Sequence, residues 1–132
     1  MTDLIYWTGL SGVMIALMWV PYILDRIMVN GLPAALANPP VEGPKQSPWG
    51  QRCKNAHRVA CETFVVFGAL AALTAIVHPE DTFPATLAQT YFFATLAHYL
   101  VYTAGIPVAR TLAFAVASLA TIGLGLRLIG AI

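Results

Sequence analysis

Long apolar segments without a charged side chain make up most of this sequence. A helix needs about 20 apolar residues to cross the hydrocarbon core of a bilayer. Gly105 and Pro107 interrupt the last long apolar run, as glycine and proline do between elements. The pattern therefore predicts four membrane-spanning helices. The uncharged segments are residues 4–24, 63–77, 82–109 and 111–126, and the expected spans are about 4–28, 50–77, 84–104 and 107–129.

Proline and glycine also indicate where the first two helices bend, end and begin. Pro21 lies inside the first span, where membrane helices tolerate proline, and we expect a kink there. Residues 30–51 are rich in proline and glycine and should form a surface excursion. Ser47 is the expected N-cap of the second helix, with Pro48 in its first turn. The first span is too long for a cleaved signal peptide and has no basic residue before it, so we expect it to be retained.

The composition supports an all-α membrane protein with one domain over residues 1–132. Hydrophobic residues make up 58% of the chain and charged residues 10%, whereas a soluble domain carries about 25% charged residues. The mean hydropathy is +0.72. A core of this size could not hide so much apolar surface from water, so lipid is the expected solvent. The net charge of +1 gives no basis for a nucleic-acid partner.

The basic residues predict the orientation of the chain in the membrane. With four spans, loops 25–57 and 104–109 lie on one side, and all but one of the seven Lys/Arg residues lie in or beside them. Because basic residues collect on the cytoplasmic side, both loops should be cytoplasmic and both termini non-cytoplasmic. Arg127 alone lies on the other side, with Asp3, Glu80 and Asp81. The cytoplasmic basic residues are Arg26, Lys45, Arg52, Lys54, Arg58 and Arg110.

The two cysteines are expected to be free thiols. Cys53 and Cys61 are eight residues apart, so on one helix their Cα atoms would lie about 12 Å apart, too far for a disulfide. Together with His57 they do not form a recognisable zinc spacing. No metal site is therefore expected.

Polar side chains form stripes on three of the four expected helices. At 100° per residue, each set falls in one sector of its helix, about 120° wide in the second helix and about 60° wide in the third. The sets are Arg52, Asn55, Arg58, Val59 and Glu62 on the second helix, Tyr91, Thr95, His98 and Tyr102 on the third, and Arg110, Phe114, Ser118 and Thr121 on the fourth, bordered by Thr111.

Polar stripes in a lipid environment need partners. A charged group at the bilayer centre costs about 2.5–3.5 kcal/mol on insertion scales, and buried polar groups require hydrogen bonds. The stripes are therefore expected to face one another or a neighbouring subunit, in a cleft open to the cytoplasm. Because arginines outnumber Glu62 in such a cleft, it would suit a small anionic ligand with several carboxylates.

Simpler interpretations of the same residues remain open. Arg58 and Glu62 could be an i,i+4 ion pair that makes a buried carboxylate tolerable. His98 and Tyr102 could hold helices together by hydrogen bonds. Arg110 could be only a positively charged anchor at a helix start.

Two motifs resemble the family of membrane-associated proteins in eicosanoid and glutathione metabolism (MAPEG), which includes microsomal glutathione transferases and microsomal prostaglandin E synthase. The first is R-C-x-x-A-H-R-x-x-x-E-T at residues 52–63, continuing to Phe67. The second joins His98 and Tyr102 to the I-P-x-x-R-[ST] run at residues 106–111. LANPP at residues 36–40 is similar to the first loop of the family. The short chain is most similar to bacterial members, which would place it in the inner membrane.

The resemblance implies a homotrimer of four-helix subunits that uses glutathione as a cosubstrate and takes a lipophilic small molecule from the bilayer. It implies a glutathione site between subunits near the cytoplasmic side. At the positions that match the family, Arg110 would stabilise the thiolate with Thr111 beside it as the neighbouring hydroxyl. The residues implied to bind glutathione are Arg58, Glu62, His98 and Tyr102, with Arg52, Asn55 and Arg26 as further candidates.

Two functions of different class follow. The first is a glutathione-dependent transferase or peroxidase that acts on lipophilic electrophiles. The second is a non-catalytic trimer that binds a lipid or small hydrophobic molecule, favoured by departures from the family pattern at Asn55, Val59 and Phe114. A proton-coupled exporter is a third possibility, but Arg58 beside Glu62 would hold that carboxylate ionised.

Overall fold

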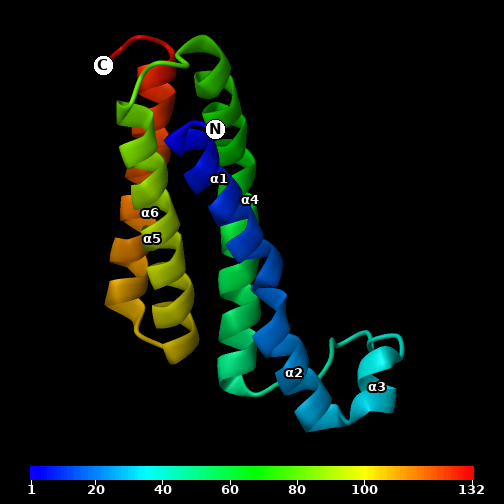
Figure 1. The fold of residues 1–132 in the computed structure, drawn as a ribbon. Coiled ribbons are helices and arrows are strands. Elements are labelled where there is room, and N and C mark those ends of the chain that lie inside the picture. The colour runs from blue at the N-terminus through cyan, green and yellow to red at the C-terminus, as the bar shows by residue number, and fades with distance from the viewer.

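The fold consists of six helices and no strand, in a computed structural model that describes all 132 residues (Figure 1). Each predicted span begins and ends within two residues of a helix boundary. The uncharged segments therefore located the helices well. The helices are α1 (Asp3–Leu17), α2 (Trp19–Asn30), α3 (Leu32–Leu36), α4 (Pro48–Val77), α5 (Phe83–Ala104) and α6 (Pro107–Leu128).

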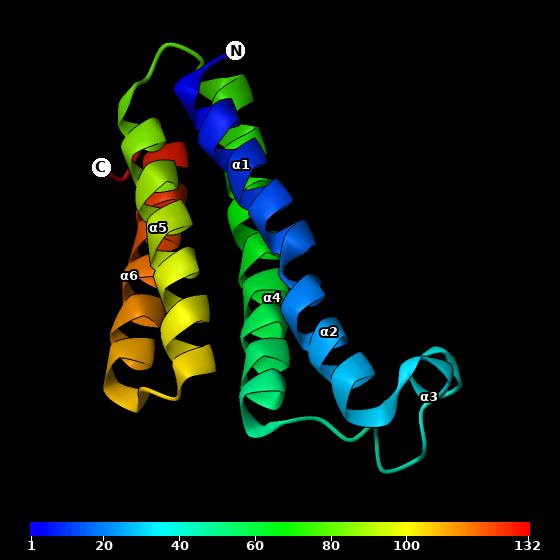
Figure 2. The same cartoon turned by 60° about the horizontal axis from the view of Figure 1, so that its bottom comes forward.

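The long helices lie side by side, and α3 projects away from them. Helix α5 packs on α6, on α4 and on α1, and α2 packs on α4 (Figures 1 and 2). Both chain termini lie at the end that carries the connection between α4 and α5. The loop between α3 and α4 lies at the opposite end, which also carries the turn between α5 and α6 (Figure 1).

Three helical stretches are long and apolar enough to cross a membrane: Asp3–Asn30, Pro48–Val77 and Pro107–Leu128. Helix α5 is not among these three stretches; it has 22 residues and carries polar side chains. Several of them, including Thr95 and His98, are buried inside the protein rather than exposed to lipid. The fourth predicted span therefore stays a prediction for α5.

The first span is interrupted, as its proline predicted. Helix α1 ends at Leu17 and α2 begins at Trp19. Proline lacks an N–H, and its ring crowds the carbonyl four residues earlier, which for Pro21 is that of Leu17. The chain relieves this at Met18, whose N–H donates to the Ile15 carbonyl over 3.2 Å, three residues back.

The core beside the two termini is built on aromatic stacking between α4 and α5. The rings of Phe67 and Tyr91 stack with their centroids 3.9 Å apart and their planes 2° apart, and both residues are fully buried. Small residues surround them, among them Ala71, Ala88 and Ala120. These alanines let the helix axes approach closely.

A second core lies nearer the other end and contains one of the cysteines. The Cys53 sulfur lies 2.9 Å from the Tyr99 hydroxyl, which donates to the Met18 carbonyl over 3.0 Å. Cys61 is exposed on the same helix. The prediction of two free cysteines is confirmed.

The start of α4 is fixed by a buried carboxylate. Ser47 is the N-cap and Pro48 opens the helix, as predicted, but the Ser47 side chain makes no capping bond. Instead, its backbone N–H donates to the Asp25 carboxylate over 2.9 Å. Asp25 is only 3% exposed, and a Cβ atom on Gly50 would overlap its carboxylate. The glycine is therefore required for this close packing.

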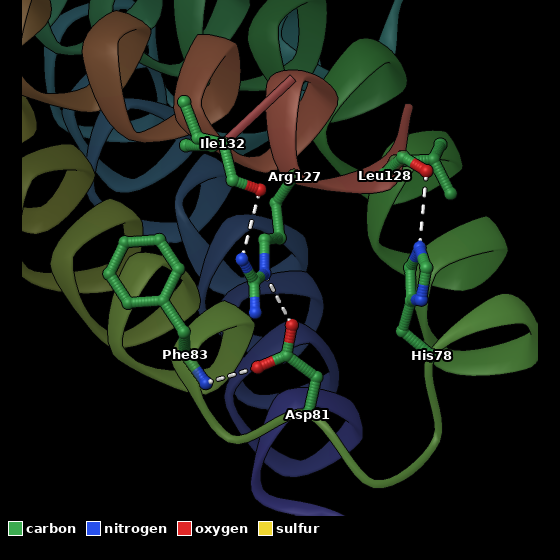
Figure 3. A network of polar contacts seen from close by, with 6 residues as sticks. All are labelled: His78, Asp81, Phe83, Arg127, Leu128 and Ile132. Carbon is green, nitrogen blue, oxygen red and sulfur yellow. Dashed lines mark hydrogen bonds and ion pairs between the residues drawn. The ribbon is translucent and has the colours of Figure 1, made fainter. Parts of the chain in front are cut away.

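The opposite end is closed by polar contacts between the α4–α5 connection and α6 (Figure 3). The Arg127 guanidinium pairs with the Asp81 carboxylate, which also accepts the Phe83 N–H over 3.0 Å. His78 lies 3.2 Å from the Leu128 carbonyl. The hydrogen bond from Arg127 holds the pKa of the Asp81 carboxyl below its usual range.

Candidate functional site

The polar stripe on α5 faces the interior of the chain. The Tyr91 hydroxyl lies 2.9 Å from the Thr63 hydroxyl on α4. The Thr95 hydroxyl is buried without a partner, and His98 is 5% exposed. This stripe follows the helical period that the sequence predicted, and it supplies the inner wall of the candidate site.

Three ring systems link the end of α5 to the start of α6. The His98 ring meets the Tyr102 ring edge-on at 5.5 Å and lies 6.1 Å from the Phe114 ring. The Arg110 guanidinium carbon lies 4.6 Å from the centre of the Tyr102 ring, within range of a cation–π contact. His98, Tyr102 and Arg110, predicted as neighbours, are therefore brought together.

Arg110 has no acidic partner. The chain forms two ion pairs, one between Arg58 and Glu62 and one between Arg127 and Asp81. The Arg110 side chain is half-buried at the first turn of α6 and carries a charge that no carboxylate of this chain neutralises. Such a group attracts an anion.

The predicted pair on α4 is present but open to the outside. Arg58 Nε lies 4.0 Å from Glu62 Oε1, and the two side chains are 68% and 69% exposed. An exposed pair of this kind is worth at most about 1 kcal/mol. It leaves both groups free to bind something else.

A groove of about 460 Å³ runs between α4 and α6 and includes Glu62 in its wall. Behind it, a void of about 10 Å³ reaches His98 and Thr95. The groove and the void share three wall residues, so the space that Glu62 lines adjoins the space that His98 lines. The shared residues are Val59, Thr63 and Phe114, and the groove is completed by Val66, Ser118, Thr121 and Ile122.

One chain does not gather the predicted residues into a single cleft. Arg110 and Thr111 line a separate hollow of about 300 Å³ at the start of α6. The α5 stripe points inward, whereas the stripes on α4 and α6 line surfaces that open outward. Arg110 lines the hollow and Phe114 lines the groove. Because Phe114 follows Arg110 by one helical turn, about 6 Å, the two spaces lie one after the other along α6.

The remaining predicted residues have other contacts. Arg52 Nε donates to the Thr103 carbonyl over 3.0 Å and so joins α4 to the end of α5. Asn55 is half-buried. The Thr111 hydroxyl is exposed and donates to the Pro107 carbonyl over 3.1 Å. Arg26 lies in a different cavity, formed by α2, α3 and the loop after it.

The comparison with known families decides what kind of protein this is. The sequence profile of the MAPEG family matches residues 4–130 of the 132-residue chain. This chain belongs to the MAPEG family. No match was found among curated proteins.

Two residues of the groove wall were not among the predicted site residues, although Ser118 belongs to the predicted polar stripe on α6 and Thr63 to the first sequence motif. Thr63 follows Glu62 directly, and its hydroxyl joins the groove to Tyr91. Ser118 lies two turns beyond Arg110 and lines the same groove. The sequence shows both as polar residues near a predicted site residue, one adjacent to Glu62 and the other two turns from Arg110, but only the packing shows that they share one wall.

The arrangement offers this MAPEG protein a defined set of chemical groups. Arg110 supplies an uncompensated positive charge, and Arg58 a second one that is only loosely paired. Glu62 supplies a carboxylate, and Thr63, Ser118 and the other groove residues supply hydroxyls and apolar surface. Such a set can bind a molecule that carries both carboxylates and an ammonium group.

Proposed function

We propose that this MAPEG protein is an integral membrane enzyme that uses glutathione to act on lipophilic electrophiles, as a transferase or a peroxidase. The observation that carries the proposal is the Arg110 guanidinium, which lies on the Tyr102 ring without an acidic partner. The guanidinium is half-buried and lies against this ring, so its charge is available to an anion from outside the chain.

Glutathione fits the groups that the chain presents. It has two carboxylates, one ammonium group and one thiol. Arg58 suits a carboxylate, because the guanidinium fork matches that geometry, and Glu62 suits the ammonium group. A groove of about 460 Å³ falls within the usual range of small-molecule sites.

The reaction requires the thiolate form of the cosubstrate. A thiol has a pKa of about 8.5, and a neighbouring cation favours its nucleophilic anion. Arg110 suits this role because it stays charged, and the Thr111 hydroxyl would turn from Pro107 to donate to the sulfur. The thiol proton passes to solvent. In the transferase reaction the thiolate forms a bond to the electrophilic carbon, and the electron pair of the bond that breaks leaves with the departing group or, in an addition, is protonated by solvent. In the peroxidase reaction the thiolate attacks a peroxide oxygen, the other oxygen leaves as an alkoxide that solvent protonates, and a second glutathione converts the resulting sulfenic acid to the disulfide and water.

The other residues on α5 would orient the cosubstrate. The Tyr102 ring would hold the Arg110 guanidinium in place, and the edge-on contact with His98 would support that ring. Arg52 and Asn55 would lie at the cytoplasmic mouth. Arg26, in its own cavity, would not contact glutathione within the same chain.

The open side of the groove supports an assembly of subunits. Arg58 and Glu62 are more than two-thirds exposed on a helix apolar enough to span a membrane, where lipid is a poor partner for charge. We infer a homotrimer of four-span subunits in which each groove is covered by a neighbouring subunit. The two termini would then face away from the cytoplasm, as the basic residues predict.

A non-catalytic lipid-binding trimer is the second candidate. Val59 and Phe114 place apolar surface in the middle of the groove wall, where a polar cosubstrate would prefer hydrogen-bonding groups. This arrangement favours a hydrophobic occupant.

Calorimetric titration of glutathione into the purified protein in detergent separates the two candidates. We expect saturable binding that is lost in Arg110→Ala and Glu62→Gln. Lys54→Ala is the matched control, because Lys54 is an exposed cation on α4 that lines neither hollow, and it should bind like the unaltered protein. Absence of binding at millimolar glutathione contradicts the enzyme and leaves the lipid-binding trimer.

A further inference from the structure

A second polar cavity lies at the far end of α2, away from the α4–α6 groove. It has a volume of about 340 Å³ and is enclosed by the last turns of α2, by α3 and by the loop that follows. Its only charged members are Arg26 and Lys45, and both are positive. The single carboxylate of that loop, Glu42, is not part of the wall.

Arg26 is unsatisfied in this cavity. Its Nε atom is buried and has no hydrogen-bond partner, and it takes part in no ion pair. The adjacent Asp25 cannot serve, because its buried carboxylate is held by the Ser47 N–H. A buried donor without a partner costs about 1–3 kcal/mol, and more when it is charged. The Arg26 side chain also lines the cavity, and no carboxylate of the chain neutralises its guanidinium, so its charge is available to an anion bound there.

The cavity is held in shape by side-chain bonds between α2 and the loop. The Asn30 amide donates to the Arg26 carbonyl over 3.0 Å and to the Lys45 carbonyl over 2.8 Å. Gln46 donates to the Tyr22 carbonyl over 2.8 Å. These bonds hold the loop backbone at Lys45 against α2, and both basic residues line the cavity.

The surface around the cavity is apolar, and it lies at one end of a membrane-spanning stretch. Met28 is 83% exposed, Leu36 is 78% exposed and Leu32 is 53% exposed. Helix α3 contains only apolar residues, and it projects sideways from the long helices (Figure 2). A short apolar helix beside two cations is suited to the boundary between headgroups and acyl chains.

We propose that this cavity binds the phosphate of an anionic phospholipid from the leaflet at this end of the protein, with α3 lying among the acyl chains. The phosphate oxygens accept from Arg26 and Lys45, as charge-assisted bonds to phosphate do. The aliphatic surface formed by Met28, Leu32 and Leu36 packs on the acyl chains. The proposal is independent of the function proposed for the α4–α6 groove.

Native mass spectrometry of the detergent-solubilised protein tests the proposal with three probes: phosphatidylglycerol, phosphatidylcholine and inorganic phosphate. We expect phosphatidylglycerol to bind more tightly than phosphatidylcholine. Binding should weaken at least about tenfold in Arg26→Gln and Lys45→Gln, while Lys54→Gln, an exposed cation on α4, should bind as before. In Leu32→Asn/Leu36→Asn, the lipid should also bind more weakly.

Several results would overturn this assignment. Equal binding of the two lipids would show that the site does not select an anionic headgroup, which contradicts the proposal. Unchanged binding in Lys45→Gln would show that this cation does not hold the phosphate, and since the Lys45 side chain is exposed, misfolding would not confuse that result. Displacement of the lipid by inorganic phosphate at equal concentration would assign the site to free phosphate instead.

Discussion

Replacing Tyr102 tests whether the aromatic ring positions Arg110. The guanidinium carbon lies 4.6 Å from the ring centre, and both residues are half-buried. A cation–π contact is worth about 0.5–1 kcal/mol when exposed and about 2 kcal/mol when desolvated. For a half-buried pair we take about 1 kcal/mol, which corresponds to about a fivefold effect on rate or affinity.

Two substitutions separate the ring from its hydroxyl. Tyr102→Phe keeps the ring face, and the Tyr102 hydroxyl makes no hydrogen bond within the chain, so kcat/KM should change by less than about twofold. Tyr102→Leu removes the ring and frees the guanidinium, so kcat/KM should fall about fivefold. The assay is glutathione conjugation to a lipophilic electrophile in detergent, with glutathione affinity measured by calorimetry.

The contrast between the two variants decides the result. If Tyr102→Phe loses as much activity as Tyr102→Leu, then the hydroxyl and not the ring is important, and the argument from the Arg110 contact is refuted. Double substitution with Arg110→Ala provides a control, because Tyr102→Leu should then have little additional effect.

Three further predictions concern stability and thiol exposure. Gly50→Ala should lower the free energy of unfolding by about 1–3 kcal/mol, because the new methyl group would overlap the buried Asp25 carboxylate. The control Gly9→Ala should not destabilise the protein, because nothing lies within 4 Å of the added Cβ atom. Equal shifts in the thermal unfolding of the two variants in detergent would contradict the packing argument. The Asp81–Arg127 pair should stabilise the protein at pH values above the ordinary aspartate pKa of about 3.9, and this contribution should vanish as the pH falls through the lowered pKa of Asp81 in the folded state. The thermal unfolding of Asp81→Asn should therefore depend less on pH in the acid range. A pH profile identical to that of the unaltered protein would argue against the pair. Maleimide should label Cys61 in the folded protein, because Cys61 is exposed, and Cys53 only after unfolding, because Cys53 is buried. Rapid labelling of folded Cys61→Ser would show that Cys53 is accessible and would contradict this prediction.

The sequence predicted the helices well because their boundaries have local causes. Ser47 and Pro48 define the start of α4, and Gly105, in a left-handed conformation with φ of 82°, ends α5. Pro21 predicted a disturbance, although the break lies at Met18. Helix α3 was not predicted, because five residues within a proline-rich loop carry no periodic pattern.

The site was less predictable than the fold. Periodicity places His98 and Tyr102 on one face of α5, but it does not say in which direction that face points. The rotation of each helix depends on packing, such as that of Phe67 on Tyr91, and on residues distant in sequence. For this reason the sequence could not show that Arg26 lies in its own cavity.

The central claim is that Arg110 attracts and stabilises the glutathione thiolate. The most direct test is an ultraviolet absorbance titration of the thiolate with pH, in protein saturated with glutathione. The account predicts a bound thiol with a pKa clearly below about 8.5, which returns to that value in Arg110→Gln. Bound glutathione whose thiol titrates like the free molecule in the unaltered protein would contradict the account.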